Sequence, residues 1–343
     1  MILRVISAGQ LTFFFAMQYP KGPYLQAQLY NPNISYTKLL RFEGCTESRA
    51  FIEGSAMNKI VRVLHSQSEH WVGDGFPVRT LFSYNDDAAA ISPFLLFDYA
   101  GPRVFAPSDT PRGVGRHPHR GFETVTIVYD GEVSHRDSTG GGGTIGPGDV
   151  QWMTAANGII HEEFHSKAFT KTGGPFRMVQ LWVNLPAADK MRSAGYQAIT
   201  SAEIPVVAFA GGKTRVIAGE FRGTRGPART FTSVNLWDVR LTNAADVEFS
   251  LTPGHNTMIA VLAGHVTING TERLGEAEIA QFERESDQVA IRADGDSMVL
   301  VLTGKPIDEP VAGHGPFVMN SEVEIRQAIS DFNSGRFGDV AAA

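Results

Sequence analysis

Short apolar runs alternate with glycine and proline turns through the first part of the chain. Between residues 82 and 185 these runs cover 94–99, 123–129, 149–154, 158–164 and 177–184. The turns include Asp130-Gly131 and the sequence GPGD at residues 146–149. Short runs bounded by such turns are typical of strands. The pattern predicts an antiparallel β-barrel or jelly roll over this part of the chain.

The second part of the chain repeats this arrangement. Its apolar runs cover residues 215–221, 233–242, 257–262, 265–268, 277–282, 288–292 and 297–302. The turn at residues 262–265, followed by a strand and Asn269-Gly270, has the same form as the turn at residues 129–131. We interpret the chain as a duplicated barrel. The predicted fold class is all-β, with two jelly-roll-type barrels in tandem.

One helix is predicted near the C-terminus. Ser321 and Glu324 have the spacing of a capping box, and Gly335 follows the helix. The apolar side chains fall at positions i, i+3, i+4 and i+7, namely Ile325, Ala328, Ile329 and Phe332. Because such a stripe is normally buried, we expect this C-terminal α-helix to pack on a barrel and tie the two halves together. Residues 186–191 are expected to be a short helix or a linker.

Residues 1–56 differ in character from the rest. They hold four of the eight tyrosines and Cys45, without sustained periodicity. From Met57 onward the sequence resembles the N-terminus of a protein that leads into strands. We predict a poorly ordered N-terminal extension over 1–56, with Met57 as an alternative start; an arm that wraps the barrel is the other interpretation. The predicted barrels then cover residues 57–190 and 191–343.

The composition narrows the function classes. A net charge of −6 argues against nucleic-acid binding, which needs clustered Lys and Arg. With Cys45 as the only cysteine, neither an intrachain disulfide nor a cysteine-rich zinc site can form. No apolar run reaches eighteen residues, so no membrane-spanning helix is expected. We expect a cytoplasmic protein that binds neither nucleic acid nor membrane.

Two histidine-containing pairs carry the candidate chemistry. They are His117-Pro-His119 and His161-Glu-Glu163. Each pair has i, i+2 spacing, so on a strand both side chains point to the same face. About forty residues separate the pairs, which is enough for a barrel to bring them together. Three imidazoles and a carboxylate would bind a divalent transition metal and leave positions open.

The second part of the chain has no such pair. His255, His265 and His314 stand alone there. A single metal site, in the predicted first barrel, is therefore expected.

Three longer motifs resemble those of the pirin family. Pirins are bicupins, proteins of the cupin superfamily that contain two cupin barrels. They are HPHRGFETVTIVYDGEVSHRDS at 117–138, GDVQWMTAANGIIHEE at 148–163 and HGPFVMNSEVEIRQAISDFNSGRFG at 314–338. The resemblance runs from about residue 57 to residue 338 and does not cover residues 1–56. It implies two cupin barrels in tandem, with metal in the first. Matched to the family's pattern, the four ligands are His117, His119, His161 and Glu163.

The resemblance also implies a cofactor and an activity. The family's usual metal is Fe²⁺, and the ligand set also suits other divalent transition metals. Bacterial pirins resemble quercetin 2,3-dioxygenases, which open a flavonol ring with O₂. In this interpretation a small aromatic substrate binds at the metal, and Glu163 acts as the catalytic base. The alternatives are a non-enzymatic, iron-dependent regulator acting through protein partners, and a metal-binding stress protein.

Neighbouring residues have other expected roles. Because the family takes its carboxylate from the second motif, Glu123 is expected to support the ligands or the fold. Glu162 should point outward, His135 should lie in a turn or an ion pair, and His165 is not expected to be a ligand. Four apolar residues would either line a pocket or belong to the core: Phe122, Trp152, Met153 and Phe176.

Overall fold

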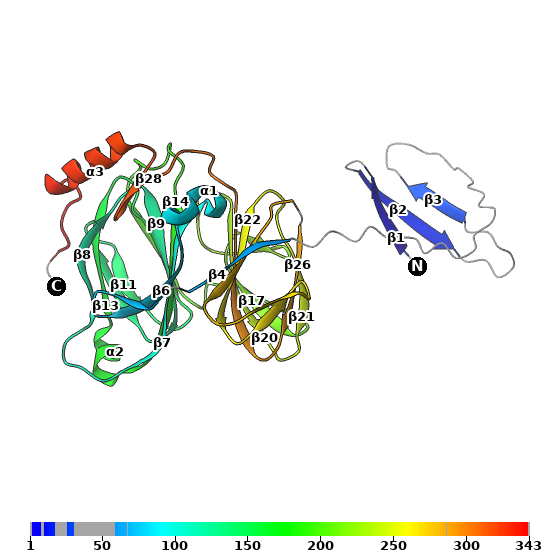
Figure 1. Ribbon diagram of the computed structural model, residues 1–343, viewed down its shortest axis with the longest axis horizontal. Coiled ribbons are helices and arrows are strands. Elements are labelled where there is room, and N and C mark those ends of the chain that lie inside the picture. Colours follow the sequence, from blue (N-terminus) through cyan, green and yellow to red (C-terminus); the bar gives the residue numbers. More distant parts are fainter. Residues whose placement is uncertain are drawn as a thin grey trace. The chain divides into compact units, whose positions relative to one another are not determined.

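The computed structural model divides the chain into two units, residues 1–54 and 55–343. The described residues are 59–66, 68–285 and 287–341, together with the backbone of residues 2–7, 10–17 and 26–30. In the first unit β1 (Ile2–Ser7), β2 (Gln10–Met17) and β3 (Gln26–Tyr30) form an antiparallel sheet in that order (Figure 1). The rest of the predicted extension at 1–56 lies outside the described residues, and its poor order stays a prediction.

The second unit contains two barrels, and the first barrel consists of two sheets. The larger sheet contains β5 (His70–Val72), β6 (Phe76–Ser83), β7 (Phe94–Phe105), β9 (Phe122–Asp130), β12 (Val150–Thr154), β14 (Gly174–Asn184) and β15 (Gly195–Ile199), in the order β15-β12-β9-β14-β7-β6-β5. The smaller sheet contains β8 (Gly113–His119), β10 (Val133–Asp137), β11 (Gly142–Ile145) and β13 (Ile159–His165), in the order β11-β10-β13-β8. Two short helices accompany them, α1 (Tyr84–Ile91) and α2 (Lys167–Thr172).

The second barrel repeats the plan. Its larger sheet contains β4 (Ile60–His65), β16 (Val206–Phe209), β17 (Gly212–Ala218), β20 (Val234–Leu241), β22 (Asn256–Ala263), β25 (Glu278–Phe282) and β27 (Ser297–Gly304), in the order β16-β17-β20-β27-β22-β25-β4. Its smaller sheet contains β21 (Asp246–Ser250), β23 (Val266–Ile268), β24 (Glu272–Leu274) and β26 (Gln288–Ala293), in the order β21-β26-β23-β24. The hairpin of β18 (Glu220–Phe221) and β19 (Thr224–Arg225) is separate. These two barrels confirm the predicted all-β cupin fold.

Each barrel receives one edge strand from the other half of the chain. β4 precedes the first barrel in sequence but pairs with β25 of the second. β15 follows the linker but pairs with β12 of the first. The linker itself consists of turns at residues 187–191. The predicted ranges 57–190 and 191–343 therefore exchange one strand in each direction.

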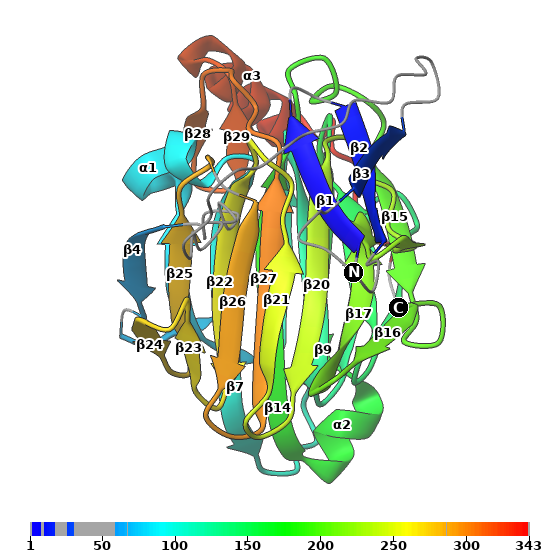
Figure 2. The same cartoon turned by 90° about the vertical axis from the view of Figure 1, so that its right-hand side faces the viewer.

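The larger sheets of the two barrels pack face to face (Figures 1 and 2). Val125 and Ile127 of β9 belong to the same buried apolar cluster as Leu300 and Leu302 of β27. Since successive strand residues alternate between faces, the even-numbered residues of β9 point into the first barrel. The interior of the second barrel is filled by a separate apolar cluster that includes Phe221, Trp237, Phe249, Ile259 and Val301.

The C-terminal segment leaves the second barrel and returns to the first. It contains β28 (Ala312–His314), β29 (Phe317–Met319) and α3 (Glu322–Asn333). The Ser321 hydroxyl accepts a hydrogen bond from the backbone of Glu324, which confirms the predicted cap. Ile325 and Ala328 of α3 are buried in a cluster that includes Ile160 of β13. The helix thus packs on the first barrel.

Candidate metal centre

Strand pairing brings the two histidine pairs together. β8 and β13 run antiparallel, with His117 opposite His161 and His119 opposite Ile159. The ligand atoms of His117, His119 and His161 all lie within 4.8 Å of one another. The ring centroids are 4.1 Å apart for His117 and His161, and 4.8 Å apart for His119 and His161. These three side chains could hold one metal ion.

His117 and His119 each have one ring nitrogen without a hydrogen-bond partner among the described residues. The Nδ1 of His117 lies 2.8 Å from the carbonyl oxygen of Gly115, which can only accept, so Nε2 keeps its lone pair. In His119, Nδ1 is buried without a partner among the described residues. Each ring therefore has a nitrogen that is available to a metal ion.

Burial favours the neutral form of two of these histidines. His119 and His161 have exposed fractions of 5% and 0%. Burial, followed by the charges of neighbouring histidines, lowers the pKa of both rings well below the usual value. Neutral imidazole is the form that binds metals. Buried, unpaired and neutral nitrogens fit a metal ion, since buried polar atoms otherwise need hydrogen-bond partners.

Glu163 lies next to this trio on the same strand as His161. A register shift separates the two residues in the pairing with β8, while Glu163 lies opposite His135 in β10. One carboxylate oxygen lies within 4.8 Å of ligand atoms of His135 and His161. Its Oε1 accepts hydrogen bonds from Gln151 at 3.2 Å and Thr126 at 3.5 Å. The structure thus joins Glu163 to the predicted ligands through His161, and groups it with His135.

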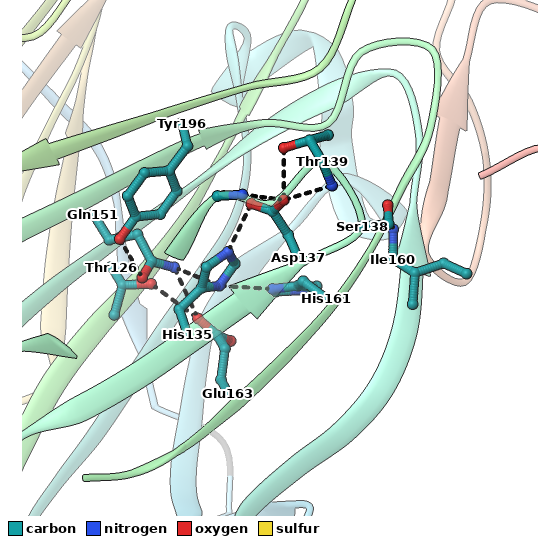
Figure 3. Close-up of polar contacts among 11 residues, drawn as sticks. Thr126, His135, Asp137, Ser138, Thr139, Gln151, Ile160, His161, Glu163 and Tyr196 are labelled. Atoms are coloured by element: carbon teal, nitrogen blue, oxygen red, sulfur yellow. Dashed lines mark hydrogen bonds and ion pairs between the residues drawn. The ribbon is translucent and has the colours of Figure 1, made fainter. Parts of the chain in front are cut away.

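His135 is a part of the site that the sequence interpretation missed. It was predicted to lie in a turn or an ion pair. The expected contact with a carboxylate is present, because its Nε2 lies 3.2 Å from Asp137 Oδ2, but the residue lies in strand β10 and not in a turn. Its Nδ1 lies 3.2 Å from Nδ1 of His161 (Figure 3). The i, i+2 spacing of His135 and Asp137 was the available signal.

Two nearby carboxylates face away from the histidines. Glu162 forms ion pairs with Arg136 and Arg116, as expected for an outward residue on β13. Glu123 is an odd-numbered residue of β9 and so lies on the face toward the second barrel. Its carboxylate accepts a hydrogen bond of 2.7 Å from Thr154, and it belongs to neither candidate metal group.

The remaining aromatic residues divide between site and core. His165 contacts the carbonyl of Gly75 at 3.0 Å and packs among phenylalanines that include Phe176. Trp152 belongs to the core between the barrels, and Met153 to a small separate cluster. Phe122 lies 5.2 Å from His119, and Trp182, which was not predicted, lies 5.4 Å from it between ring centroids. Of the predicted pocket residues, Phe122 borders the ligand set.

Another unpredicted residue, Lys190, anchors the surroundings of the site. It has 1% of its surface exposed. Its ammonium donates to the carbonyls of Gly121 and Val318 at 2.7 and 3.0 Å, and to the side chain of Asn184 at 2.6 Å. Lys190 thereby joins the linker to β14 and the C-terminal segment. Only the packed structure reveals this role, because nothing in its sequence neighbourhood marks it.

Both candidate metal groups found in the described part of the chain lie in the first barrel. In the second barrel, His255 contacts the hydroxyl of Thr303 at 3.3 Å. None of the described helices has the length and apolar character needed to cross a membrane.

Fold and site together define a two-barrel cupin protein with a histidine-rich centre in the first barrel. Comparison with known proteins agrees. The model of the family Pirin matches residues 75–183, and that of the Pirin C-terminal cupin domain matches residues 236–338. A Pseudomonas aeruginosa protein named "Putative quercetin 2,3-dioxygenase PA2418" is 53% identical over 283 residues, which cover 82% of this chain and 99% of that protein. The chain belongs to the pirin family.

Two further proteins show the breadth of the similarity. Human pirin is 36% identical over 261 residues, which cover 72% of this chain and 83% of human pirin. A crystal structure of quercetin 2,3-dioxygenase from Acinetobacter baumannii is 51% identical, with a TM-score of 0.81. That alignment covers 83% of this chain and the whole of the other. The similarity thus extends over both barrels.

Proposed function

We propose that the protein is a metal-dependent dioxygenase that opens the ring of a flavonol of the quercetin type with O₂. The observation that carries the proposal is the convergence of His117, His119 and His161 inside the first barrel, with ligand atoms within 4.8 Å of one another. The names of the relatives support the same substrate class.

The proposed ligands are His117, His119, His161 and Glu163, and the proposed metal is Fe²⁺. A mixed set of imidazole and carboxylate donors suits iron, and manganese, cobalt, nickel, copper or zinc could also bind. When bound, such an ion supplies Lewis acidity, which lowers the pKa of a coordinated hydroxyl group. A set without thiolates is less typical of a purely structural zinc site.

Glu163 is the proposed acceptor of the flavonol's hydroxyl proton. Gln151 and Thr126 both donate to Oε1 and hold the carboxylate in place. Among the described residues no donor contacts Oε2, so this oxygen could bind the metal or, when it is not bound to the metal, take the proton. Such a carboxylate can act as a general base toward a hydroxyl group that comes within hydrogen-bond reach.

The surroundings favour an aromatic substrate that approaches from the side of His117. His117 is half-buried, whereas the other three proposed ligands are buried. The rings of Phe122 and Trp182 lie 4.3 Å apart and border His119. These apolar rings would contact a planar substrate and exclude water from the reacting atoms.

The test is an assay of anaerobically purified protein reconstituted with Fe²⁺. Quercetin depletion, O₂ uptake and carbon monoxide release should occur together in the wild type. E163Q should lower kcat about 100-fold or more, because it removes the proposed base and changes a proposed metal ligand. The matched control is E162Q, the adjacent residue that faces outward, and it should retain wild-type activity.

Two outcomes would contradict the proposal. One is an iron-replete wild type that consumes no O₂ with any flavonol or catechol-like compound. The other is an equal loss of activity in E162Q and E163Q. In the first case, capture of protein partners by the ferrous and ferric forms would test the regulatory alternative.

A further inference from the structure

A buried chain of polar side chains lies behind His161 (Figure 3). It runs from Asp137 through His135 to His161, and from His135 through Gln151 to Glu163. The side chains of His135 and Asp137 have no exposed surface. In such a place each polar atom needs a partner of opposite hydrogen-bonding role. The role of each atom can therefore be assigned from its neighbours.

Asp137 determines which nitrogen of His135 carries hydrogen. Its Oδ1 accepts hydrogen bonds from the backbone and hydroxyl of Thr139 and from the backbone of Gly141, at 2.6 to 3.0 Å. Its Oδ2 lies 3.2 Å from Nε2 of His135. Because both oxygens of the Asp137 carboxylate accept hydrogen bonds, Nε2 of His135 must carry the hydrogen. In the neutral ring Nδ1 is then an acceptor.

The contacts of Gln151 also identify Nδ1 of His135 as an acceptor. Its Nε2 lies 3.2 Å from Oε1 of Glu163 and 3.1 Å from Nδ1 of His135, so it donates to both. Its Oε1 accepts a hydrogen bond from the hydroxyl of Tyr196 at 3.3 Å. The amide orientation is thus determined by three partners. Nδ1 of His135 is again an acceptor.

The tautomer of His161 follows from these roles. Its Nδ1 lies 3.2 Å from Nδ1 of His135, an acceptor that it shares with Gln151. His161 must therefore donate from Nδ1 and keep the lone pair on Nε2. That Nε2 is the buried nitrogen of His161 that has no partner among the described residues.

We infer that His135 is a positioning residue for the metal centre. It selects the tautomer of His161 that presents a free Nε2, and through Gln151 it holds the carboxylate of Glu163. The ring of Tyr196 stacks on His135 with centroids 5.2 Å apart and planes at 18°, which restrains the imidazole. This inference rests on the metal site of the proposed function. His135 acts through two proposed ligands.

The experiment compares H135N with H135Q. The Asn amide replaces Nδ1 and can still accept from His161, whereas the Gln amide reaches the Nε2 position and contacts Asp137 alone. Apo protein is titrated with Co²⁺, followed by calorimetry and by the visible absorption of the bound ion. H135Q should bind Co²⁺ about 10- to 100-fold more weakly, as is typical when a group that orients a ligand is lost. The Co²⁺ affinity of H135N should stay within about 3-fold of that of the wild type, because the Asn amide still accepts the hydrogen bond from His161.

His165 supplies the matched control. It is also a buried histidine of the first barrel, but its Nε2 contacts the backbone of Gly75 and it belongs to neither metal group. H165Q should keep the Co²⁺ affinity and spectrum of the wild type.

The outcomes separate the two proposals. Equal affinities of H135N and H135Q, whether both retained or both lost, would overturn the positioning role alone. A wild type that binds no Co²⁺ would overturn the metal site of the proposed function, and the present inference with it.

Discussion

Glu163 and Glu123 are both buried in the first barrel, yet they face opposite sides of it. Glu163 contacts two donors and lies beside His161. Glu123 lies on the side of β9 that faces the second barrel, with the Thr154 hydroxyl as its partner. Burial raises the pKa of Glu123 to about 7, although the hydrogen bond from Thr154 lowers it in part.

Glu123→Gln should therefore stabilise the protein at alkaline pH. The pKa of Glu123 is about 7 in the folded state and near 4.3 in the unfolded chain. Between these values the folded state binds more protons, so stability falls as pH rises from about 4 to about 7. Ionised Glu123 costs the folded state about 3.5 kcal/mol at pH 8. Urea unfolding should show E123Q more stable than wild type by up to that amount at pH 8, with equal stabilities at pH 4.

A suitable control is Glu248→Gln, on the exposed side of β21. It should follow the pH profile of the wild type. If E123Q and wild type kept a constant difference from pH 4 to pH 8, the assignment of Glu123 as a buried acid would be wrong.

At the scale of elements, the C-terminal hairpin depends on a close approach to the first barrel. Gly121 has a φ of +91°, and a Cβ there would lie 2.0 Å from the carbonyl oxygen of Val318. Val318 donates its backbone N–H to Arg120, and its carbonyl accepts from Lys190. The hairpin therefore packs on the barrel only where residue 121 has no side chain.

Gly121→Ala should destabilise the protein far more than a glycine substitution in open space. Gly140 has a similar φ of +84°, and a Cβ there would have no neighbour within 4 Å. G140A should cost about 1 kcal/mol from backbone strain alone. G121A adds a clash with the Val318 backbone and should cost about 3 kcal/mol or more. Urea unfolding of the two variants measures the difference, and equal costs would show that the hairpin moves away freely.

At the scale of the whole second unit, the two barrels share one core and exchange edge strands. The cluster between the larger sheets contains residues of β9 and β27, and β4 and β15 each pair with the other half's sheet. Separating the barrels would expose this apolar surface to water and break both strand pairings. We expect residues 55–343 to unfold as a single cooperative unit.

Metal binding to the first barrel should therefore protect the second. With Co²⁺ at about 100 times its dissociation constant, global unfolding becomes about 100-fold rarer. In hydrogen exchange, the slowest amides of β9 and β27 exchange by global unfolding, so both should slow by this factor. Slowing confined to β9 would show that the barrels unfold separately.

The sequence by itself determined what depends on local spacing. Strand-length apolar runs and turn residues predicted two barrels, and the capping box at Ser321 predicted α3. The i, i+2 spacing of His117 with His119, and of His161 with Glu163, predicted which side chains share a face. These properties follow from backbone periodicity, which any short segment expresses without the rest of the chain.

Only the tertiary structure decided which faces meet. Strand register placed His135 opposite Glu163, and the packing of one barrel on the other buried Glu123 away from the histidines. The exchange of β4 and β15, and the contacts of Lys190 with Gly121 and Val318, likewise join residues far apart in sequence. Such contacts depend on the register and on the packing of whole sheets, and local periodicity carries no information about either.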